Sequence, residues 1–445
     1  MRSPRRAPKL SVIVPVLDEA PSIVAALGQL QPLRHAGHEL IVVDGGSRDG
    51  TLRLAAPFAD RTLGSPRGRA VQMNVGAAIA TGNVLVFLHA DCRLPPDADR
   101  AIGSALARGS RWGRFDVVLE GASRELPMVA AFMNARSGAS GIATGDQAIF
   151  VERTTFDAIG GFPALPLMED VAFSRTLKRF AGRPARLNER VVASGRRWDA
   201  DGAWRTILSM WALRWAYWRG ADPRELARRY YGVAPRHPPT LQVFAKAPVP
   251  GRVKTRLAQT IGAEAAVSAY RALAERTLAT AAAARRAGVV GAIELWLDPE
   301  SDPAAIAPWR DRFGVTIETQ AGDDLGARMR NALRASLARG VPALLVGTDV
   351  PGYDVVYLAH AASALERHDA VMGPAEDGGY VLVGLARDVD VFGGVPWSTP
   401  EVMAATRTRL AAAGANHIEL PPLWDVDTHD DFLRWRDRPL TVAAS

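Results

Sequence analysis

The sequence predicts an α/β protein built from two consecutive α/β/α sandwiches, each with a mostly parallel sheet. The chain has 445 residues, too many for one ordinary domain. Short apolar runs alternate with Ala-rich helical stretches in both halves, which is the pattern of βαβ units. Three prolines stand within residues 235–239, where they cannot continue a helix or a central strand. We therefore expect domains at 9–231 and 241–438, joined by a Pro-rich linker at 232–240.

The apolar periodicity places the elements of each domain. In the first domain the expected strands are Leu10–Pro15, Glu39–Val43 and Val84–Leu88, with helices near Ser22–Leu33, Thr51–Phe58 and Arg69–Ala80. In the second domain the expected strands are Leu241–Ala245, Ile293–Leu297, Ala343–Val346 and Ala370–Met372, with helices near Ala263–Ala284, Asp324–Arg339 and Val355–Arg367.

The composition is that of a soluble globular protein, with 48% hydrophobic and 23% charged residues. The single cysteine, Cys92, excludes an internal disulfide framework and is typical of a reducing compartment. No apolar run reaches about 18 residues, so we expect neither a signal peptide nor a membrane-spanning helix. A cytoplasmic protein is the expectation.

Charge is distributed unevenly between the halves. Residues 1–240 hold 33 Lys and Arg against 22 Asp and Glu, a net charge of +11, whereas residues 241–445 hold 21 against 25, a net charge of −4. A basic half suits anionic ligands or an anionic membrane surface. Nucleic acid is not an expected partner, because zinc-finger spacing and aromatic-basic RNA signatures are absent.

Two acids follow apolar strands of the first domain. Asp44 precedes Gly45 and a second acid, Asp49, and Asp91 ends the run that starts at Val84. Because open α/β sheets bind ligands at the carboxyl edge of their strands, this order suggests a nucleoside held by Asp44 and a metal-bound diphosphate held by Asp91. Such oxygen donors suit Mg²⁺ or Mn²⁺. Asp49 alone is equally explained as a turn residue and helix cap.

Glu169 and Asp170 form the next acidic group, directly before an amphipathic helix expected at Val171–Phe180. One carboxylate would cap the helix, and the other would accept a proton from an acceptor hydroxyl. Pure capping is the alternative. Further along, Arg196 and Arg197 stand beside Trp198, and guanidinium groups match phosphate oxygens. A solvated basic turn is the alternative there.

Together these motifs resemble the family-2 GT-A glycosyltransferases, and the group most similar is the arsenosugar-biosynthesis and carotenoid-type glycosyltransferases. The resemblance covers residues 9–230 and implies a GT-A-type fold, that of nucleotide-diphospho-sugar transferases, and a UDP- or GDP-linked sugar donor. It implies that Asp91 holds the metal, that the Glu169–Asp170 pair supplies the base, and that the Arg-Arg-Trp element closes on the diphosphate and acceptor. The metal motif is commonly Asp-x-Asp, and His89 stands at its first position here. The expected donor-binding residues are Pro15, Asp18, Glu19, Asp44, Gly45, Asp49, Arg196, Arg197 and Trp198.

A tryptophan stripe follows. Trp204, Trp211, Trp215 and Trp218 share one helical face, and Arg205, Arg214 and Arg219 flank them. The pattern suits an interfacial helix lying on an anionic bilayer, which would bring the enzyme to a lipid-linked acceptor. Packing against the same domain or a second subunit is the alternative.

The second domain carries its own phosphate and metal signals. A Gly/Pro loop between a strand and a helix supplies cations suited to a diphosphate or triphosphate, although it lacks the order of a Walker loop. Acids follow in three later segments, the last of which is alternatively a cap for the helix expected at Asp430–Arg436. We expect a metal at Asp349 and Asp427. The expected nucleotide-binding residues are Lys246, Arg252, Lys254, Arg256, Asp377, Gly378 and Gly379.

Residues 241–438 resemble the DUF2064 family and are similar to nucleotidyltransferases that join a nucleotide to a sugar phosphate, phospholactate or molybdopterin. We therefore predict a metal-dependent, inverting glycosyltransferase acting on a small or lipid-linked acceptor, fused to a domain that binds or makes the activated donor. Two alternatives stay open. The protein is chiefly a nucleotidyltransferase with the first half as a substrate-binding module, or the second half is a non-catalytic scaffold.

Overall fold

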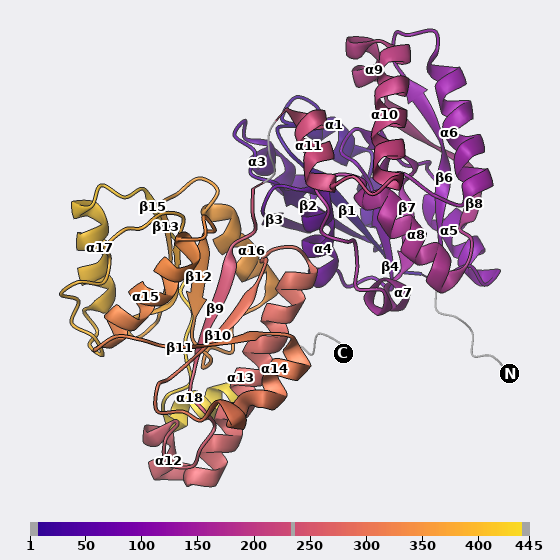
Figure 1. Ribbon diagram of the computed structural model, residues 1–445. Coiled ribbons are helices and arrows are strands. Elements are labelled where there is room, and N and C mark those ends of the chain that lie inside the picture. The colour runs from indigo at the N-terminus through magenta and orange to yellow at the C-terminus, as the bar shows by residue number, and fades with distance from the viewer. Residues whose placement is uncertain (1–7, 233–235, 438–445) are drawn as a thin grey trace, which may run out of the picture. The chain divides into compact units, whose positions relative to one another are not determined.

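The computed structural model describes residues 8–232 and 236–437, and the chain divides into two compact units. The first extends to Arg236 and includes Arg286–Gly288, and the second comprises His237–Arg285 and continues from Val289. Residues 233–235 of the expected linker lie outside the described residues. Each unit places helices on a central sheet, which confirms the predicted α/β class (Figure 1).

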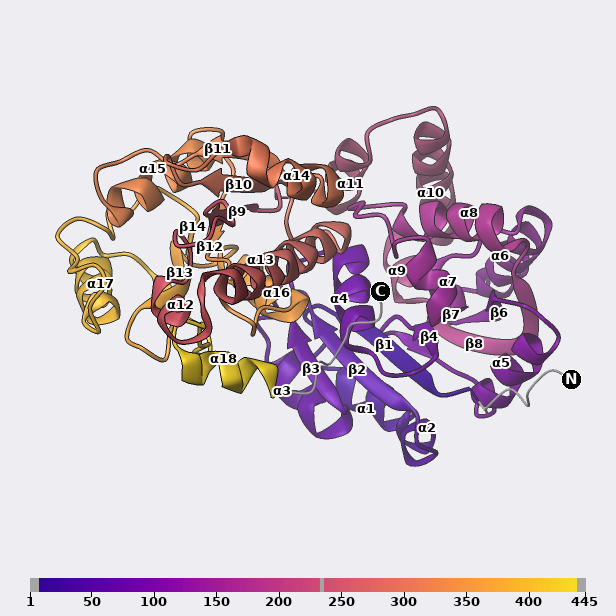
Figure 2. The same ribbon diagram turned by 90° about the horizontal axis from the view of Figure 1, so that it is seen from below.

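The first unit contains one sheet in the order β3-β2-β1-β4-β7-β6-β8-β5. Figure 2 shows β3, β2, β1 and β4 side by side in this order, and these four pair in parallel. Beyond them β7 is antiparallel to both β4 and β6. The strands are β1 (Leu10–Val16), β2 (Glu39–Asp44), β3 (Arg61–Gly64), β4 (Val84–Phe87), β5 (Cys92–Arg93), β6 (Trp112–Glu120), β7 (Ile149–Glu152) and β8 (Ala185–Ser194).

Helices cover this sheet. They are α1 (Ile23–Gly28), α2 (Gln31–His35), α3 (Thr51–Ala55), α4 (Arg69–Ile79), α5 (Ala98–Ala107), α6 (Leu126–Ser140), α7 (Arg153–Ala158), α8 (Glu169–Ala181), α9 (Arg196–Asp201), α10 (Ala203–Trp218) and α11 (Pro223–Tyr231). Two 3₁₀ turns, Ala56–Phe58 and Gly145–Gln147, complete the unit. The prediction of a single helix at Ser22–Leu33 is wrong, because two helices occupy this region. Pro32 lies in the first turn of α2, where its missing N–H is tolerated, and α1 ends before it.

Both faces of the first sheet are buried. Val12, Val14 and Val42 belong to a core that α5 and α6 help to cover. On the opposite face Phe87 packs edge-on against Phe162, whose ring stacks on Phe173 of α8 at a centroid distance of 3.8 Å. The aromatic packing fixes α8 against β4. It thereby sets the position of the acids at the start of α8.

The second unit repeats the arrangement, with a sheet in the order β11-β10-β9-β12-β14-β13-β15. Here β11, β10, β9 and β12 are parallel, and β14 is antiparallel to its two neighbours. The strands are β9 (Thr240–Ala245), β10 (Ile293–Leu297), β11 (Thr316–Thr319), β12 (Ala343–Val346), β13 (Ala370–Pro374), β14 (Tyr380–Leu385) and β15 (His417–Glu419). The helices are α12 (Thr255–Ile261), α13 (Ala263–Arg286), α14 (Ala307–Phe313), α15 (Leu325–Leu337), α16 (Val355–Ala364), α17 (Val402–Ala412) and α18 (His429–Arg436), with a 3₁₀ turn at Pro303–Ile306.

The parallel strands bring the predicted acids of the first unit to one sheet edge. Asp44 is the last residue of β2, and Asp91 follows β4 by a short turn. Because β2 and β4 flank β1, their ends lie two strand spacings, about 10 Å, apart. Pro15 of β1 lies beyond the residues that pair with β4, so its missing N–H removes no ladder bond to that strand. Among the described helices, none combines the length and apolarity needed to cross a bilayer.

Candidate active site

A cavity of about 680 Å³ opens in the first unit, above the carboxyl edge of its sheet. Polar lining comes from the turn after β4, the Gly145–Gln147 turn and the start of α8. Apolar lining comes mainly from α6 and α10, which stand next to each other in Figure 1. The predicted residues that line it are Asp91, Glu169, Asp170, Arg196 and Trp198.

Asp91 presents an exposed carboxylate to the cavity. Its oxygen, a ring nitrogen of buried His89 and the buried Cys92 sulfur lie within 4.8 Å of one another. Burial, together with the nearby acids Asp146 and Asp91, raises the pKa of Cys92 well above its usual value. A sulfur donor is also softer than the oxygen donors that Mg²⁺ and Mn²⁺ prefer. Asp91 forms no ion pair within the described part of the chain. An oxygen donor of this kind fits Mg²⁺ or Mn²⁺ shared with substrate oxygens.

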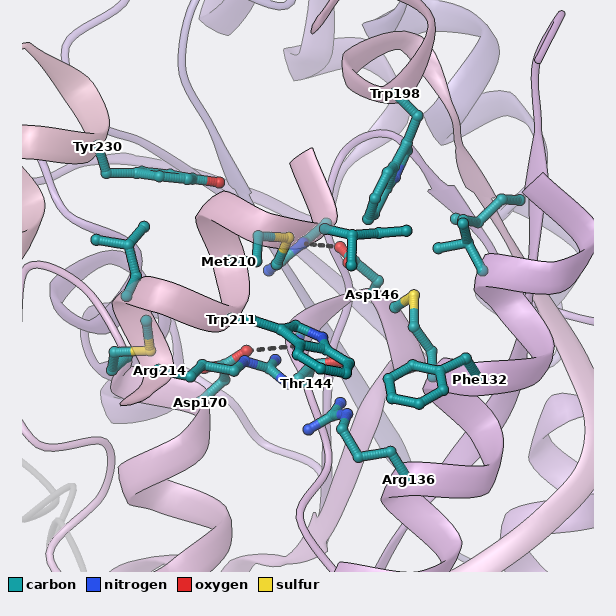
Figure 3. Close-up of a pocket in the computed structure, with 18 of the residues that line it drawn as sticks. Phe132, Arg136, Thr144, Asp146, Asp170, Trp198, Met210, Trp211, Arg214 and Tyr230 are labelled. Carbon is teal, nitrogen blue, oxygen red and sulfur yellow. Dashed lines mark hydrogen bonds and ion pairs between the residues drawn. The ribbon is translucent and has the colours of Figure 1, made fainter. Parts of the chain in front are cut away.

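His89 occupies the position where Asp-x-Asp is usual, and the structure gives it a partner. Its Nδ1 lies 3.3 Å from Oδ1 of Asp146, the contact drawn in Figure 3. Burial would raise the pKa of Asp146, but the contact with His89 and the charges of Arg69 and Arg214 lower it. A Cβ on Gly145 would lie 2.2 Å from the His89 ring, so only glycine allows the turn to approach the imidazole.

Glu169 and Asp170 open α8, where Met168 is the N-cap with a left-handed φ of 68°. Asp170 is half-buried and lines the cavity. Its Oδ2 accepts a hydrogen bond from the Gly145 N–H at 3.0 Å, and its Oδ1 accepts one from Val171 at 2.7 Å. Glu169 is only 6% exposed, and burial, reinforced by the charge of Asp170, raises its pKa to about 7. Two neighbouring carboxyl groups therefore differ strongly in burial.

Asp18 and Asp49, two of the expected nucleoside-binding acids, form hydrogen bonds between the loops that follow β1 and β2. Oxygens of Asp44 accept hydrogen bonds from the N–H groups of Gly46 at 3.1 Å and Ser47 at 3.0 Å. Asp18 Oδ1 accepts one from Arg48 at 2.8 Å, and Asp49 accepts one from Ala20 at 2.9 Å. These acids thus shape the loops after β1 and β2, with Asp49 also accepting from Thr51 at the start of α3, as the turn interpretation predicted. None of the three lines the cavity.

The Arg-Arg-Trp element joins those loops to the cavity. Arg196 Nη2 lies 3.3 Å from Glu19 Oε2, and Trp198, 9% exposed, forms part of the cavity wall. The Arg197 side chain lies outside the described side chains. The element therefore connects the expected donor side of the edge with the cavity itself.

Sequence reasoning missed part of this site. Arg69 at the start of α4 and Arg136 in α6 line the cavity, and so do Phe132 and Met133. Arg214 was recognised only as a flank of the tryptophan stripe, but it too lines the cavity. The one sequence signal was the position of Arg214, which stands four residues before Trp218 and therefore near the same helical face.

In the second unit the predicted metal-binding acids, Asp349 and Asp427, lie on either side of Lys254. Lys254, whose side chain is 6% exposed, places Nζ 2.9 Å from Asp349 Oδ2 and 3.7 Å from Asp427 Oδ1. Arg256 Nη1 lies 2.8 Å from the other oxygen of Asp427. Within the described residues, the His89–Asp91–Cys92 group is the one set of three potential ligands close enough to share an ion, so the second-unit acids do not form such a set here.

Two further acids, Asp425 and Asp377, add negative charge near Asp349. Burial, together with the charges of Asp349 and Asp377, raises the pKa of Asp425 to about 6. Asp377 Oδ1 accepts a hydrogen bond from Gly379 at 3.0 Å. Gly378 has a φ of 93°, and a Cβ there would lie 2.3 Å from the Pro400 carbonyl oxygen. The glycine is therefore required by the fold of the loop.

The two other predicted cations contact the loop differently. The backbone N–H of Lys246 donates to the Tyr270 hydroxyl at 2.8 Å, and the residue is exposed. Arg252 Nη1 donates to the Glu300 carbonyl at 3.1 Å. The side chains of Lys246 and Arg252 are exposed, so a phosphate would contact them at the protein surface.

Two families match parts of the chain. Residues 11–116 match the family described as Glycosyl transferase family 2, and residues 277–399 match the one described as an uncharacterized protein conserved in bacteria, DUF2064. The first match contains Asp44 and Asp91, and the second contains Asp349 and Asp377. The predicted resemblance of each half is confirmed at this level. The arsenosugar or carotenoid-type subgroup stays a prediction.

Individual relatives agree with the first match. The chain is 39% identical over 93 residues to a PGL/p-HBAD biosynthesis glycosyltransferase of Mycobacterium bovis (strain BCG / Pasteur 1173P2), covering 19% of this chain and 36% of that protein. It therefore spans about a third of that relative's length. A putative nucleotide-diphospho-sugar transferase from Desulfovibrio desulfuricans G20 is 29% identical, with a TM-score of 0.42 over 46% of this chain and 90% of that chain. Glucosyl-3-phosphoglycerate synthase from Mycobacterium tuberculosis, solved with Mn²⁺, UDP and glucosyl-3-phosphoglycerate, is 21% identical, with a TM-score of 0.34 over 45% and 78%.

Proposed function

We propose that the first unit transfers a sugar from a UDP- or GDP-linked donor to an acceptor hydroxyl, with Mg²⁺ or Mn²⁺ as cofactor. One observation carries this proposal: Asp91 and the Glu169–Asp170 pair line the same cavity. Sugar transfer needs an anchor for the leaving diphosphate and a base for the acceptor, and these two acidic groups suit the two tasks. The cavity volume, about 680 Å³, is that of a small-molecule site.

The donor would lie along the sheet edge. The loops that Asp18, Asp44 and Asp49 hold together would seat the nucleoside, beside Pro15 and Gly45 at the strand ends. Asp91 would hold the ion with the diphosphate oxygens, and His89 lies within reach of the same position. When bound, the ion neutralises the charge that develops on the leaving diphosphate. Arg196, Arg197 and Trp198 would close over the diphosphate from α9.

The chemistry is a single displacement. The acceptor oxygen bonds to the anomeric carbon while the bond from that carbon to the diphosphate oxygen breaks, so the configuration inverts. The hydroxyl proton passes to a carboxylate, and the nucleoside diphosphate leaves. Asp170 is the better placed of the two acids, because it faces the cavity while Glu169 is 6% exposed.

The test is nucleoside-diphosphate release from a panel of UDP and GDP sugars with Mn²⁺. We expect Asp91→Asn to reduce release by at least about 100-fold, because the diphosphate loses its anchor. Asp349→Asn is the matched control, a strand-edge acid of the second unit, and is expected to leave release unchanged. Unchanged release in Asp91→Asn would contradict the proposal. No release from any donor would favour the nucleotidyltransferase alternative, which pyrophosphate release from nucleoside triphosphates would then test.

For the second unit we propose binding or synthesis of the activated donor. Lys254, Asp349 and Asp427 gather where β9 and β12 end, with Asp377 and Asp425 near enough to affect one another. Pyrophosphate release from a nucleoside triphosphate and a sugar phosphate tests synthesis, and Asp349→Asn should abolish it. Absence of nucleotide binding to the second unit would favour the scaffold alternative. This division of labour follows the domain limits 9–231 and 241–438.

We also propose that α10 rests on the inner face of the cell membrane. Trp215 and Trp218 are 61% and 75% exposed, and Arg219 stacks on Trp215 at 5.0 Å. Indoles beside arginines suit an anionic lipid surface. Flotation with anionic liposomes tests the idea, since Trp215→Ser with Trp218→Ser removes two indoles that do not line the cavity. Equal flotation of wild type and this variant would contradict it.

A further inference from the structure

Two arginines face the same part of the cavity from different helices. Arg136 projects from α6 and Arg214 from α10, and Figure 3 shows both side chains reaching toward the region of Asp170. Neither guanidinium forms an ion pair or a hydrogen bond with any other described residue. They are not the cations of a structural salt bridge.

The two arginines repel each other, because they are like charges that no described carboxylate pairs with. Nη2 of Arg136 is buried without a hydrogen-bond partner. Burial, with the repulsion of Arg214, lowers the pKa of Arg136 to about 10, although Asp170 acts in the opposite direction. At neutral pH Arg136 is still charged. Both residues are half-buried, and no described carboxylate forms an ion pair with either, so this part of the cavity suits an anionic ligand group.

The wall beside these arginines is apolar and built from the same two helices. Phe132 of α6 and Trp211 of α10 pack with ring centroids 5.4 Å apart. Met128 and Leu208 continue the wall, and all four residues are between 46% and 66% exposed. Exposed apolar surface inside a cavity suits an apolar ligand group. Together, the two arginines and the apolar wall suit an amphiphilic ligand, with an anionic group and an apolar portion.

We propose that the acceptor carries an anionic group, a phosphate or carboxylate, bound between Arg136 and Arg214, and an apolar portion that lies against Phe132 and Trp211. The anion would then hold the acceptor hydroxyl next to Asp170. This inference rests on the proposed function, since it names the acceptor of the same reaction. The donor diphosphate is assigned elsewhere, to Asp91 at the sheet edge and to the arginines of α9.

Binding of decyl phosphate to the full-length protein, below micelle formation, tests the proposal. Decanol supplies the tail alone, and inorganic phosphate supplies the anion alone. Titration calorimetry should show decyl phosphate binding at least about tenfold more tightly than either, because both halves of the site are filled. Equal affinities for decyl phosphate and decanol would overturn the anionic half of the proposal.

Variants separate the two halves of the site. Arg136→Gln and Arg214→Gln should each weaken decyl phosphate at least about tenfold, and Arg205→Gln, on an exposed position of α10 outside the cavity, should not. Phe132→Ala should weaken decyl phosphate and leave inorganic phosphate unaffected. Loss of folding is not expected for the arginine variants, because each removes an unpaired charge. Circular dichroism checks this.

A competition experiment distinguishes acceptor from donor. UDP with Mn²⁺ should bind alongside decyl phosphate, and displacement of one by the other would reassign the arginines to the donor diphosphate. Asp91→Asn should lose nucleoside-diphosphate release and keep decyl phosphate binding. Failure of the present inference therefore appears as unchanged binding in the arginine variants. Failure of the proposed function appears as unchanged release in Asp91→Asn.

Discussion

The two units carry the same strand-edge acid in opposite electrostatic surroundings. Asp91, after β4, is exposed to a cavity, and Arg136 and Arg214, which line the same cavity, form no ion pair with any described residue. Asp349, after β12, is already paired with buried Lys254 at 2.9 Å. A strand that ends in aspartate therefore positions a carboxylate, but the neighbouring charges decide whether that carboxylate is available to an ion. Among the described residues, Asp91 of the first unit forms no ion pair, whereas Asp349 of the second unit is paired with Lys254.

The largest effect that tests this contrast is expected at Asp170. Asp170→Asn keeps an oxygen that can accept the Gly145 hydrogen bond and removes the proton acceptor. We expect sugar transfer to fall by about 10²- to 10⁴-fold, with nucleoside-diphosphate binding unchanged. Initial rates with a saturating donor measure this. Asp349→Asn is the matched change in the second unit, and an equal loss there would break the comparison.

The next effect concerns stability and pH. Because the pKa of Glu169 is raised from 4.5 to about 7, the folded chain holds this proton more tightly than the unfolded chain. The associated stability is fully present below about pH 4.5 and is lost as pH rises through about 7, a change of up to about 3 kcal/mol. Glu169→Gln should lack it. Urea unfolding of both proteins at pH 5 and pH 8 measures the difference.

A wild type and a Glu169→Gln variant that respond identically to pH would show that the pKa of Glu169 is the same in the folded and unfolded states. The greater burial of Glu169 would then have no effect on its protonation. Other groups that titrate in this range cancel, because they are common to both proteins.

The smallest expected effect is in the second unit. Lys254→Met leaves Asp349 without its cation and should destabilise the surroundings of α12 by about 2 kcal/mol, less than for a fully buried pair because both acids are partly exposed. Millimolar Mg²⁺ should restore part of this loss if Asp349 and Asp427 form a metal site. Hydrogen exchange of residues 255–261 measures it. Lys246→Met is the control, and protection by Mg²⁺ in that control alone would contradict the expectation.

The central parallel strands β1, β2, β4, β9, β10 and β12 were predictable because each is a short, largely buried apolar run. The parallel edge strands β3 and β11 were not predicted, because they are short and partly exposed. Ile293–Leu297 and Ala343–Val346 were predicted with their observed bounds. The strands β6 and β8 were not predicted. In β8, Arg186, Glu189 and Arg190 interrupt the apolar pattern, and the strand forms because it pairs with β6, about 70 residues earlier.

The acids of the site were predictable from their positions after strands, and the cations were not. Asp91, Glu169 and Asp170 follow local patterns that a sequence displays. Arg136 and Arg214 meet only because α6 and α10 pack together, and nothing in either helix alone indicates that meeting. The same limit hid Lys254: its loop was recognised as cationic, but its burial between Asp349 and Asp427 is a tertiary property.

The unpartnered guanidinium of Arg136 has a practical consequence. A folded protein that holds uncompensated charge gains stability from any compound that binds only the folded form, in proportion to the logarithm of its concentration over its dissociation constant. The melting temperature of this protein should therefore rise with each compound that fills the cavity. A thermal-shift library of hydroxylated anionic amphiphiles can rank acceptors before the sugar is known.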